Sequence, residues 1–403
     1  MRSLRFFERT LGITAASAVV LAAVFLTGVG EQLWEPFFGK YLKERFFKEL
    51  APALWAVGIY SCVKNLLEGA FYIGGGYLSQ RLGSKFSLVL FGLGPILGYI
   101  LFLVGDTPAV AVAGTIMILS WEPLTVPASF SVVGERKKTI TFVLHAFQKR
   151  LPKLLGPLLG GLVIGGLGWV EGPETMIRVA LGAAVLALVL QAWLLPPGGT
   201  GRPLHGLRSL WRSMDSRLKG LLAAEVLTRW CDWFVRDMVV LYCTEILRAD
   251  SRLYGTLVAI QMGSSLVSYL PAGVLSDRGH RRALIGLTFF FFAAFPAVLA
   301  LSTPGAWAIP VLAFMAYGLR EIGEPTRKAV ITFLMPEGRK AEGVGAYWGL
   351  RTFAICPAPL AGAWIWTSFG AQALLWTAAA FGAAALLVYG AISRGLDAQV
   401  EKA

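Results

Sequence analysis

Long apolar stretches alternate with short polar connections along the whole chain, and this alternation predicts its helices. Six apolar stretches come first, and six more follow a polar segment rich in proline and glycine. They span residues 11–38, 53–78, 86–104, 109–132, 141–167 and 177–195 in the first half, and 220–241, 254–275, 283–301, 307–333, 345–366 and 373–392 in the second. A helix of about 20 residues crosses the apolar core of a bilayer. The pattern therefore predicts an all-α integral membrane protein with 12 transmembrane helices in two six-helix bundles.

Composition supports the same class of protein. Of the 403 residues 56% are hydrophobic and 15% are charged, whereas soluble domains have about 25% charged residues. The four cysteines lie in apolar stretches at irregular spacing, so we interpret them as small core residues and expect neither a disulfide framework nor a metal site. We expect no cofactor.

The distribution of basic residues predicts the orientation of the chain. Lys and Arg exceed Asp and Glu by 13, an excess that would favour nucleic-acid binding in a soluble protein. Here most basic residues of the connections gather in alternate ones: Arg2, Arg5, Arg9, Arg81, Lys85, Arg136, Lys137, Lys138, Arg208, Arg212, Arg217, Lys219, Arg278, Arg281, Arg282, Arg339, Lys340 and Arg394. Exceptions include Lys40, Lys43, Arg45 and Lys48 in the first outer connection, where Glu44 and Glu49 offset them. By the positive-inside rule these connections are cytoplasmic. We therefore expect both termini to be cytoplasmic, membrane lipids as partners, and no nucleic acid.

The two halves repeat each other. Glu122-Pro123 recurs 202 positions later as Glu324-Pro325, and Pro157 and Gly160 recur at the same offset as Pro359 and Gly362. In the first helix of each half, Glu31 and Tyr41 align with Asp232 and Tyr242 at an offset of 201. The predicted domains are a bundle over 1–195, a cytoplasmic linker with an amphipathic segment over 196–219, and a bundle over 220–403. Parallel repeats of this kind are typical of transporters that rock two halves around a central site.

A glycine-rich basic turn follows the second helix of each half. The first copy reads Gly76-Tyr-Leu-Ser-Gln-Arg81-Leu-Gly83, and the second reads Gly273-Val-Leu-Ser-Asp277-Arg278-Gly279-His-Arg281. Together with the topology and the repeat, these turns resemble the loop signature of the major facilitator superfamily, Gly-x-Leu-Ala-Asp-Arg-x-Gly-Arg-Lys. The resemblance covers nearly the whole chain and implies a secondary transporter that works by alternating access.

The resemblance also implies that these turns latch the inward side shut. Their gating residues are Gly76, Arg81, Gly83, Gly273, Asp277, Arg278, Gly279 and Arg281. The first copy has Gln80 where the family has Asp, so the latch would depend mainly on Asp277 and Arg278. The alternative is that the turns are basic only to orient the chain. The arginine that the family often carries in its fourth helix for proton coupling is absent, because the stretch 116–126 has Glu122 as its one charge.

Charged residues inside the apolar stretches are candidates for substrate binding or ion coupling, since each costs about 2.5–3.5 kcal/mol at mid-membrane. Lys64 lies about 18 Å before the Gly76 turn at 1.5 Å per residue. It is expected either to neutralise Glu68 one turn later or to serve coupling or substrate binding. Its repeat partner, Gln261, is polar and uncharged.

A second set of charges is predicted to pair between neighbouring helices. Glu122 should lie at the depth of Lys149 and Arg150, and Glu324 at the depth of Arg351. These pairs are either structural and gating braces or substrate contacts. Lys149, Arg150 and Lys153 carry more positive charge than Glu122 alone can balance, so we expect a bound anion to complete this site. The alternative is that Lys153 pairs with Glu68 or extends its ammonium to the membrane surface.

The seventh helix carries Asp232, Trp233 and Arg236 along one face, which suits a flat or anionic ligand. The commoner role of a membrane tryptophan is to pack in the bundle or to face lipid. Glu31 and Asp232 occupy equivalent positions, and either can carry a proton if burial favours its protonated form. The alternative is a permanent salt bridge with Lys64 or Arg236.

The leading functional prediction is secondary active transport of a small organic solute, with an organic anion as substrate and a proton as coupling ion. Efflux of amphiphilic or drug-like compounds is the alternative, and a receptor or scaffold that does not transport is a second one. A phosphate-binding Gly-x-x-x-x-Gly-Lys-Ser/Thr loop is absent, as are His-Glu-x-x-His and Gly-x-Ser-x-Gly, so we predict neither ATP hydrolysis nor an enzyme. We expect a monomer in a bacterial or archaeal cytoplasmic membrane.

Overall fold

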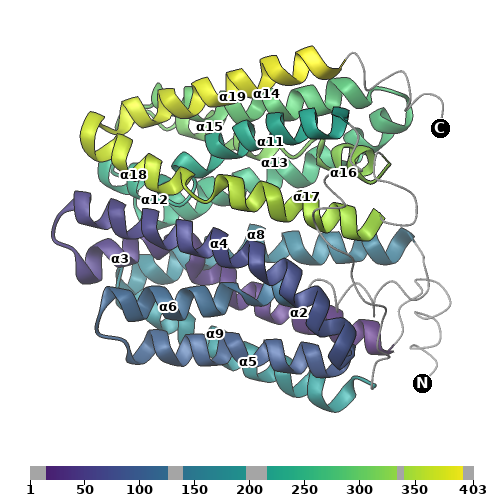
Figure 1. Ribbon diagram of the computed structural model, residues 1–403. Helices are drawn as coiled ribbons and strands as arrows, with labels where there is room; N and C mark the ends of the chain where they lie inside the picture. Colours follow the sequence, from purple (N-terminus) through teal and green to yellow (C-terminus); the bar gives the residue numbers. More distant parts are fainter. Residues whose placement is uncertain (1–14, 126–138, 197–215, 334–339, 394–403) are drawn as a thin grey trace. The chain divides into compact units, whose positions relative to one another are not determined.

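The computed structural model describes residues 15–125, 139–196, 216–333 and 340–393, and every regular element in these ranges is a helix (Figure 1). The chain forms two compact units, residues 1–46 with 67–204 and residues 47–66 with 205–403. The boundary at residue 204 falls inside the predicted linker. The division differs from the predicted one at residues 47–66, which group with the second unit.

The first unit is a helical bundle whose core is aromatic. Its elements are α2 (Ala15–Trp34), the 3₁₀ turn η1 (Glu35–Phe37), α3 (Phe38–Phe46), residues 67–82 of α4 (Leu50–Leu82), α5 (Ser84–Val104), α6 (Pro108–Leu119), α8 (Thr139–Leu167) and α9 (Glu171–Leu194). Helix α2 packs against α8 and α9, and α5 packs against α6 and α9. The buried ring of Trp34 lies 5.9 Å from that of Phe38 and 5.7 Å from that of Phe102, measured between centroids.

The second unit contains the remaining helices. Its elements are residues 50–66 of α4, α11 (Ser216–Val235), α12 (Val239–Leu241), the π-helical turn η3 (Tyr242–Ile246), α13 (Ser251–Asp277), α14 (Arg281–Ala300), α15 (Ala308–Leu319), α16 (Glu324–Phe333), α17 (Lys340–Ile355), α18 (Ala358–Phe369) and α19 (Ala371–Ser393). Helix α19 lies along α14 and α11 (Figure 1), where Tyr389 stacks on Phe289 with 4.9 Å between ring centroids. Leu218, Leu221 and Ile285 complete this core.

Both units break their first helix at the same repeat position. Helix α2 ends at Trp34 and α11 at Val235, and the next helices start at Phe38 and Val239, so each pair of positions is 201 residues apart. Pro36 accounts for the break in the first unit, because proline lacks the N–H that an α-helix needs. The candidate carboxylates Glu31 and Asp232 lie one turn before these breaks. The structure therefore places the two candidates at equivalent points of the two units.

A glycine repeated at an offset of 202 packs against each of these helices. A Cβ on Gly160 of α8 would overlap the carbonyl oxygen of Leu33, and one on Gly362 of α18 would overlap that of Phe234. Leu33 and Phe234 are themselves related by the offset of 201. Small residues allow membrane helices to approach this closely. The sequence repeat thus corresponds to a repeated packing contact.

Within the described residues, nine helices are long and apolar enough to cross a membrane. Together they support a multi-pass membrane protein. The other three predicted stretches, 220–241, 307–333 and 345–366, hold broken helices instead of continuous ones: α11 with α12, α15 with α16, and α17 with α18. The first two also carry several charged residues, and these residues form ion pairs at the candidate site of the second unit.

Candidate functional site in the second unit

One face of α11 carries charges of alternating sign. Glu225, Arg229, Asp232 and Arg236 follow one another at spacings of four, three and four residues, which place them on one side of the helix. Glu225 and Asp232 are fully buried, at 0% and 1% exposure. Buried carboxylates of this kind require cationic or hydrogen-bonding partners. The surrounding helices supply them.

Asp232 is held by cations and a phenol. The Arg320 guanidinium, at the end of α15, donates a hydrogen bond to Asp232 Oδ1, and Tyr317 Oη donates to the same oxygen at 2.9 Å. Nitrogens of Arg229 and Arg236 each lie 3.7 Å from Asp232 Oδ2. Three guanidinium groups stabilise this carboxylate as the anion. The predicted Asp232–Arg236 contact is therefore present, but Arg320 is the closer partner.

Glu225 is the centre of a second ion cluster. Its two carboxylate oxygens lie 3.2 Å from Arg327 and 3.0 Å from Arg351. Arg327 also bonds to Glu324, whose other carboxylate oxygen lies 3.3 Å from Lys328. The cluster joins α11, α16 and α17.

The predicted direct pair of Glu324 with Arg351 is wrong. Arg351 bonds to Glu225 on α11, and Glu324 bonds to Arg327 and Lys328 of its own helix. The prediction assumed that charges at the same depth on neighbouring helices meet, and it overlooked Glu225. The spacing of Glu225 from Arg229 and Asp232, at four and seven residues, was the signal that could have found it.

Arg229 lies farther from a carboxylate oxygen than Arg320, Arg327 and Arg351 do. Its side chain is 14% exposed, its Nε has no hydrogen-bond partner, and the nearest carboxylate oxygen in the described part of the chain is the one at 3.7 Å. Its guanidinium lies 5.3 Å from the ring centroid of Phe292, which Arg320 faces at 4.8 Å. An aromatic face partly compensates a cation but supplies no hydrogen-bond acceptor of carboxylate strength.

Lys64 also has a different partner from those predicted. Its Nζ donates to Asp237 Oδ2 at 3.2 Å, so it pairs neither with Glu68 nor with Glu31. Trp233 is buried and has the Lys64 ammonium at 5.2 Å and the Arg236 guanidinium at 4.7 Å from its ring centroid. Gln261, the repeat partner of Lys64, is buried on α13. Asp237 was not among the predicted candidates.

In the first unit, the described candidates are half-buried. The Gln32 side-chain amide donates to Glu31 at 3.0 Å, and no cation lies within 4 Å of Glu31 among the described residues. Glu122 follows the end of α6, and Arg150 lies on α8. The Lys149 side chain lies outside the described residues, so its predicted pairing with Glu122 stays a prediction. The equivalent carboxylates Glu31 and Asp232 therefore differ in their partners, since three arginines surround Asp232 and an amide bonds to Glu31.

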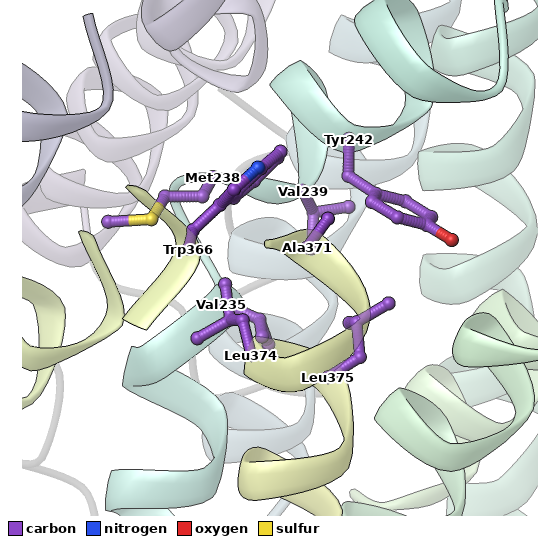
Figure 2. Close-up of a pocket in the computed structure, with 8 residues that line it drawn as sticks. All are labelled: Val235, Met238, Val239, Tyr242, Trp366, Ala371, Leu374 and Leu375. Carbon is purple, nitrogen blue, oxygen red and sulfur yellow. The ribbon is translucent and has the colours of Figure 1, made fainter. Parts of the chain in front are cut away.

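A small pocket lies at the break after α11 and is apolar. Figure 2 shows Met238, Val239 and Trp366 around it. Its lining consists of Val235, Met238, Val239, Tyr242, Trp366, Ala371, Leu374 and Leu375. No group of three potential metal ligands occurs in the described part of the chain. The charges of α11, and not this pocket, therefore form the candidate site.

Sequence comparison gives a limited match. No protein-family model matches the chain. A segment of 167 residues, which is 39% of this chain, is 26% identical to a Na(+), Li(+), K(+)/H(+) antiporter of Planococcus maritimus. The aligned segment spans 37% of that protein.

Structural comparison is more extensive. The human organic anion transporter MFSD10 (TETRAN) superposes with a TM-score of 0.69 at 15% identity, over 93% of this chain and 99% of that one. A variant of the peptide transporter POT in complex with sulfate gives 0.76 at 15% identity, over 94% of each chain. The chain has the major facilitator fold. A variant of the nucleoside transporter NupG agrees, with a TM-score of 0.73 at 11% identity, over 94% and 99% of the two chains. At such low identity the likeness establishes the fold alone.

In this major facilitator fold, each of the two loop motifs contains a glycine with a positive φ angle. Gly83 and Gly279 have φ angles of +78° and +87°, in the left-handed region that favours glycine. Gly279 follows the end of α13, and its N–H donates to Ser276 O at 3.1 Å. Arg81, Arg278 and Arg281 are exposed. The side chains of Asp277 and Gln80 lie outside the described residues, as does most of the linker.

Proposed function

We propose that this protein is a secondary active transporter that moves a small organic anion across a membrane by alternating access, with coupling to protons. The major facilitator fold supports transport, and the buried charges of the second unit support an anionic substrate. The proposal includes 12 membrane crossings, both termini on the cytoplasmic side, a monomer, and the cytoplasmic membrane of a bacterium or archaeon. The protein is proposed to have no enzymatic activity.

The surroundings of Arg229 are the observation that supports an anionic substrate. Among the described residues of the second unit, Arg320, Arg327 and Arg351 each lie within 3.2 Å of a carboxylate oxygen, whereas the nearest one to Arg229 is 3.7 Å away. Arg229 retains an Nε–H without a partner. A substrate carboxylate or phosphate would supply the missing acceptor in a bidentate geometry. In the first unit, Arg150 and Lys149 remain proposed substrate contacts.

The test is uptake of labelled organic anions into proteoliposomes by counterflow. Arg229→Gln should reduce uptake at least tenfold, because the weakly neutralised guanidinium has no substitute in the described site. Arg252→Gln removes the same charge from an exposed position on α13 and should leave uptake unchanged. Equal uptake by the two variants would exclude Arg229 as a substrate contact.

Glu31 is the proposed proton carrier. Three arginines keep Asp232 charged, whereas Glu31 has an amide as its hydrogen-bond partner and no cation within 4 Å in the described ranges. Glu31→Gln should therefore abolish uptake driven by a pH gradient while sparing exchange of substrate for substrate, since exchange moves no net proton. Asp232→Asn should impair both modes. Loss of exchange in Glu31→Gln would show that this residue does more than carry a proton.

Efflux of amphiphilic or drug-like compounds is the second candidate function. The aromatic cluster of Trp230, Phe234 and Phe381 favours it, with ring centroids 5.0–5.9 Å apart beside the charged face of α11. Transport of a lipophilic cation that survives Arg229→Gln but is lost in Asp232→Asn would support efflux over anion transport. Measurable flux of either kind would exclude a receptor or scaffold that does not transport.

A further inference from the structure

The Lys64 ammonium occupies a site that the rest of the second unit builds for it. It lies 3.2 Å from Asp237 Oδ2, 4.9 Å from the Tyr60 ring centroid and 5.2 Å from the Trp233 ring centroid. The side chains of Lys64 and Asp237 are 13% and 15% exposed. A carboxylate with two aromatic faces within about 6 Å is the arrangement by which proteins recognise organic ammonium groups.

The walls of this site are held by contacts that do not involve Lys64. Ser61 Oγ lies 2.5 Å from Asp237 Oδ2 and donates to that oxygen. Trp233 is anchored in a core cluster with Ile355 and Ala358. Within the described ranges, Lys64 is the one cation within 4 Å of Asp237. The carboxylate and the indole would thus keep their positions if the lysine side chain left.

Asn65 adds an observation that points to a ligand. It is 0% exposed, and neither its Nδ2 nor its Oδ1 has a hydrogen-bond partner. A buried amide left in this state costs about 1–3 kcal/mol. Asn65 follows Ser61 by one helical turn, so both lie on the same side of α4. It is therefore a second buried polar group on the side of α4 that carries Ser61.

We propose that Tyr60, Trp233 and Asp237 form a binding site for a free organic ammonium, a primary or methylated amine, and that Lys64 is its resident occupant in this conformation. The lysine is a tethered competitor, and tethering gives an effective concentration of about millimolar or more. A free amine therefore binds the wild-type protein weakly and gains access when Lys64 leaves. This site is separate from Arg229, and the inference does not depend on anion transport.

The test is chemical rescue of Lys64→Ala. This substitution removes three carbons and the ammonium, which together are the atoms of propylammonium. The purified variant should be less thermally stable than wild type, and propylammonium should raise its melting temperature with saturation, because a ligand stabilises the form it binds. The concentration for half-maximal effect should be at least tenfold lower than for wild type. Lys64→Ala with Asp237→Asn should show no such rise.

1-Propanol serves as the neutral control, since it has the same carbon chain without the charge. An equal rise with propanol, or a rise that persists in the double variant, would overturn the proposal. If Lys64→Ala does not fold, Lys64→Val retains more of the side chain and removes two carbons and the ammonium, so ethylammonium then replaces propylammonium. Failure of ethylammonium to stabilise that variant would equally overturn the proposal.

Discussion

Glu225 is expected to be the most costly charge to remove from the second unit. Its carboxylate is 0% exposed and bridges Arg327 at 3.2 Å and Arg351 at 3.0 Å. Two unit charges about 4 Å apart attract each other by about 4 kcal/mol at an effective dielectric constant of 20. Breaking a buried pair from one side costs a similar 3–5 kcal/mol. Glu225→Gln should therefore destabilise the protein by about 3–5 kcal/mol.

The pairing itself is measured by a double-mutant cycle of Glu225→Gln and Arg351→Gln. The double variant should be more stable than the sum of the single effects predicts, by about 1–3 kcal/mol, because it leaves no unpaired charge. Equilibrium unfolding in mixed micelles supplies the free energies. The cycle of Glu324→Gln with Arg351→Gln is the control, since these two residues do not bond. A coupling in the control as large as that of Glu225 with Arg351 would refute the assignment of partners.

Two further predictions concern packing and gating. Gly362→Ala should destabilise the protein by about 1–3 kcal/mol through overlap with Phe234 O, whereas Gly390→Ala, which meets nothing within 4 Å, should be neutral or stabilising in the same unfolding assay. Asp277→Asn should shift the resting population towards the inward-open form and reduce transport, whereas Gln80→Ala should have little effect, as reported by spin-label distances between the cytoplasmic ends of the two halves. Equal effects of the last two substitutions would contradict the latch.

Hydrophobic periodicity and the repeat predicted most of the fold. Each predicted apolar stretch contains helix in the described residues, and the offset of 201 places the breaks after Trp34 and Val235 in register. Periodicity did not predict the interruption at 320–323, because apolar residues continue on both sides of it. The ion pairs of Asp232 and Glu225 join residues of the three predicted transmembrane helices that are broken in the structure.

The role of the predicted site residues in transport stays a prediction, but the structure shows which partners their side chains have. Asp232, Trp233, Arg236 and Lys64 do lie among buried charges, but which carboxylate meets which cation depends on helix packing that spacing along one helix does not report. Glu31 and Asp232 occupy equivalent positions but have different partners, for a reason visible in the sequence. Arg320, which bonds to Asp232, has Ile118 as its counterpart 202 positions earlier.

The separation of Lys64 from Asp237 has a consequence for how the protein is made. Asp237 follows Lys64 by 173 residues, so at 5–20 residues per second the lysine waits about 9–35 s for its carboxylate during translation. Throughout that interval α4 carries an ammonium without the carboxylate that it contacts in the folded protein, and a charge in lipid costs about 2.5–3.5 kcal/mol. We therefore expect the nascent helix to stay with the insertion machinery, or to lie shallowly in the membrane, until α11 has been synthesised.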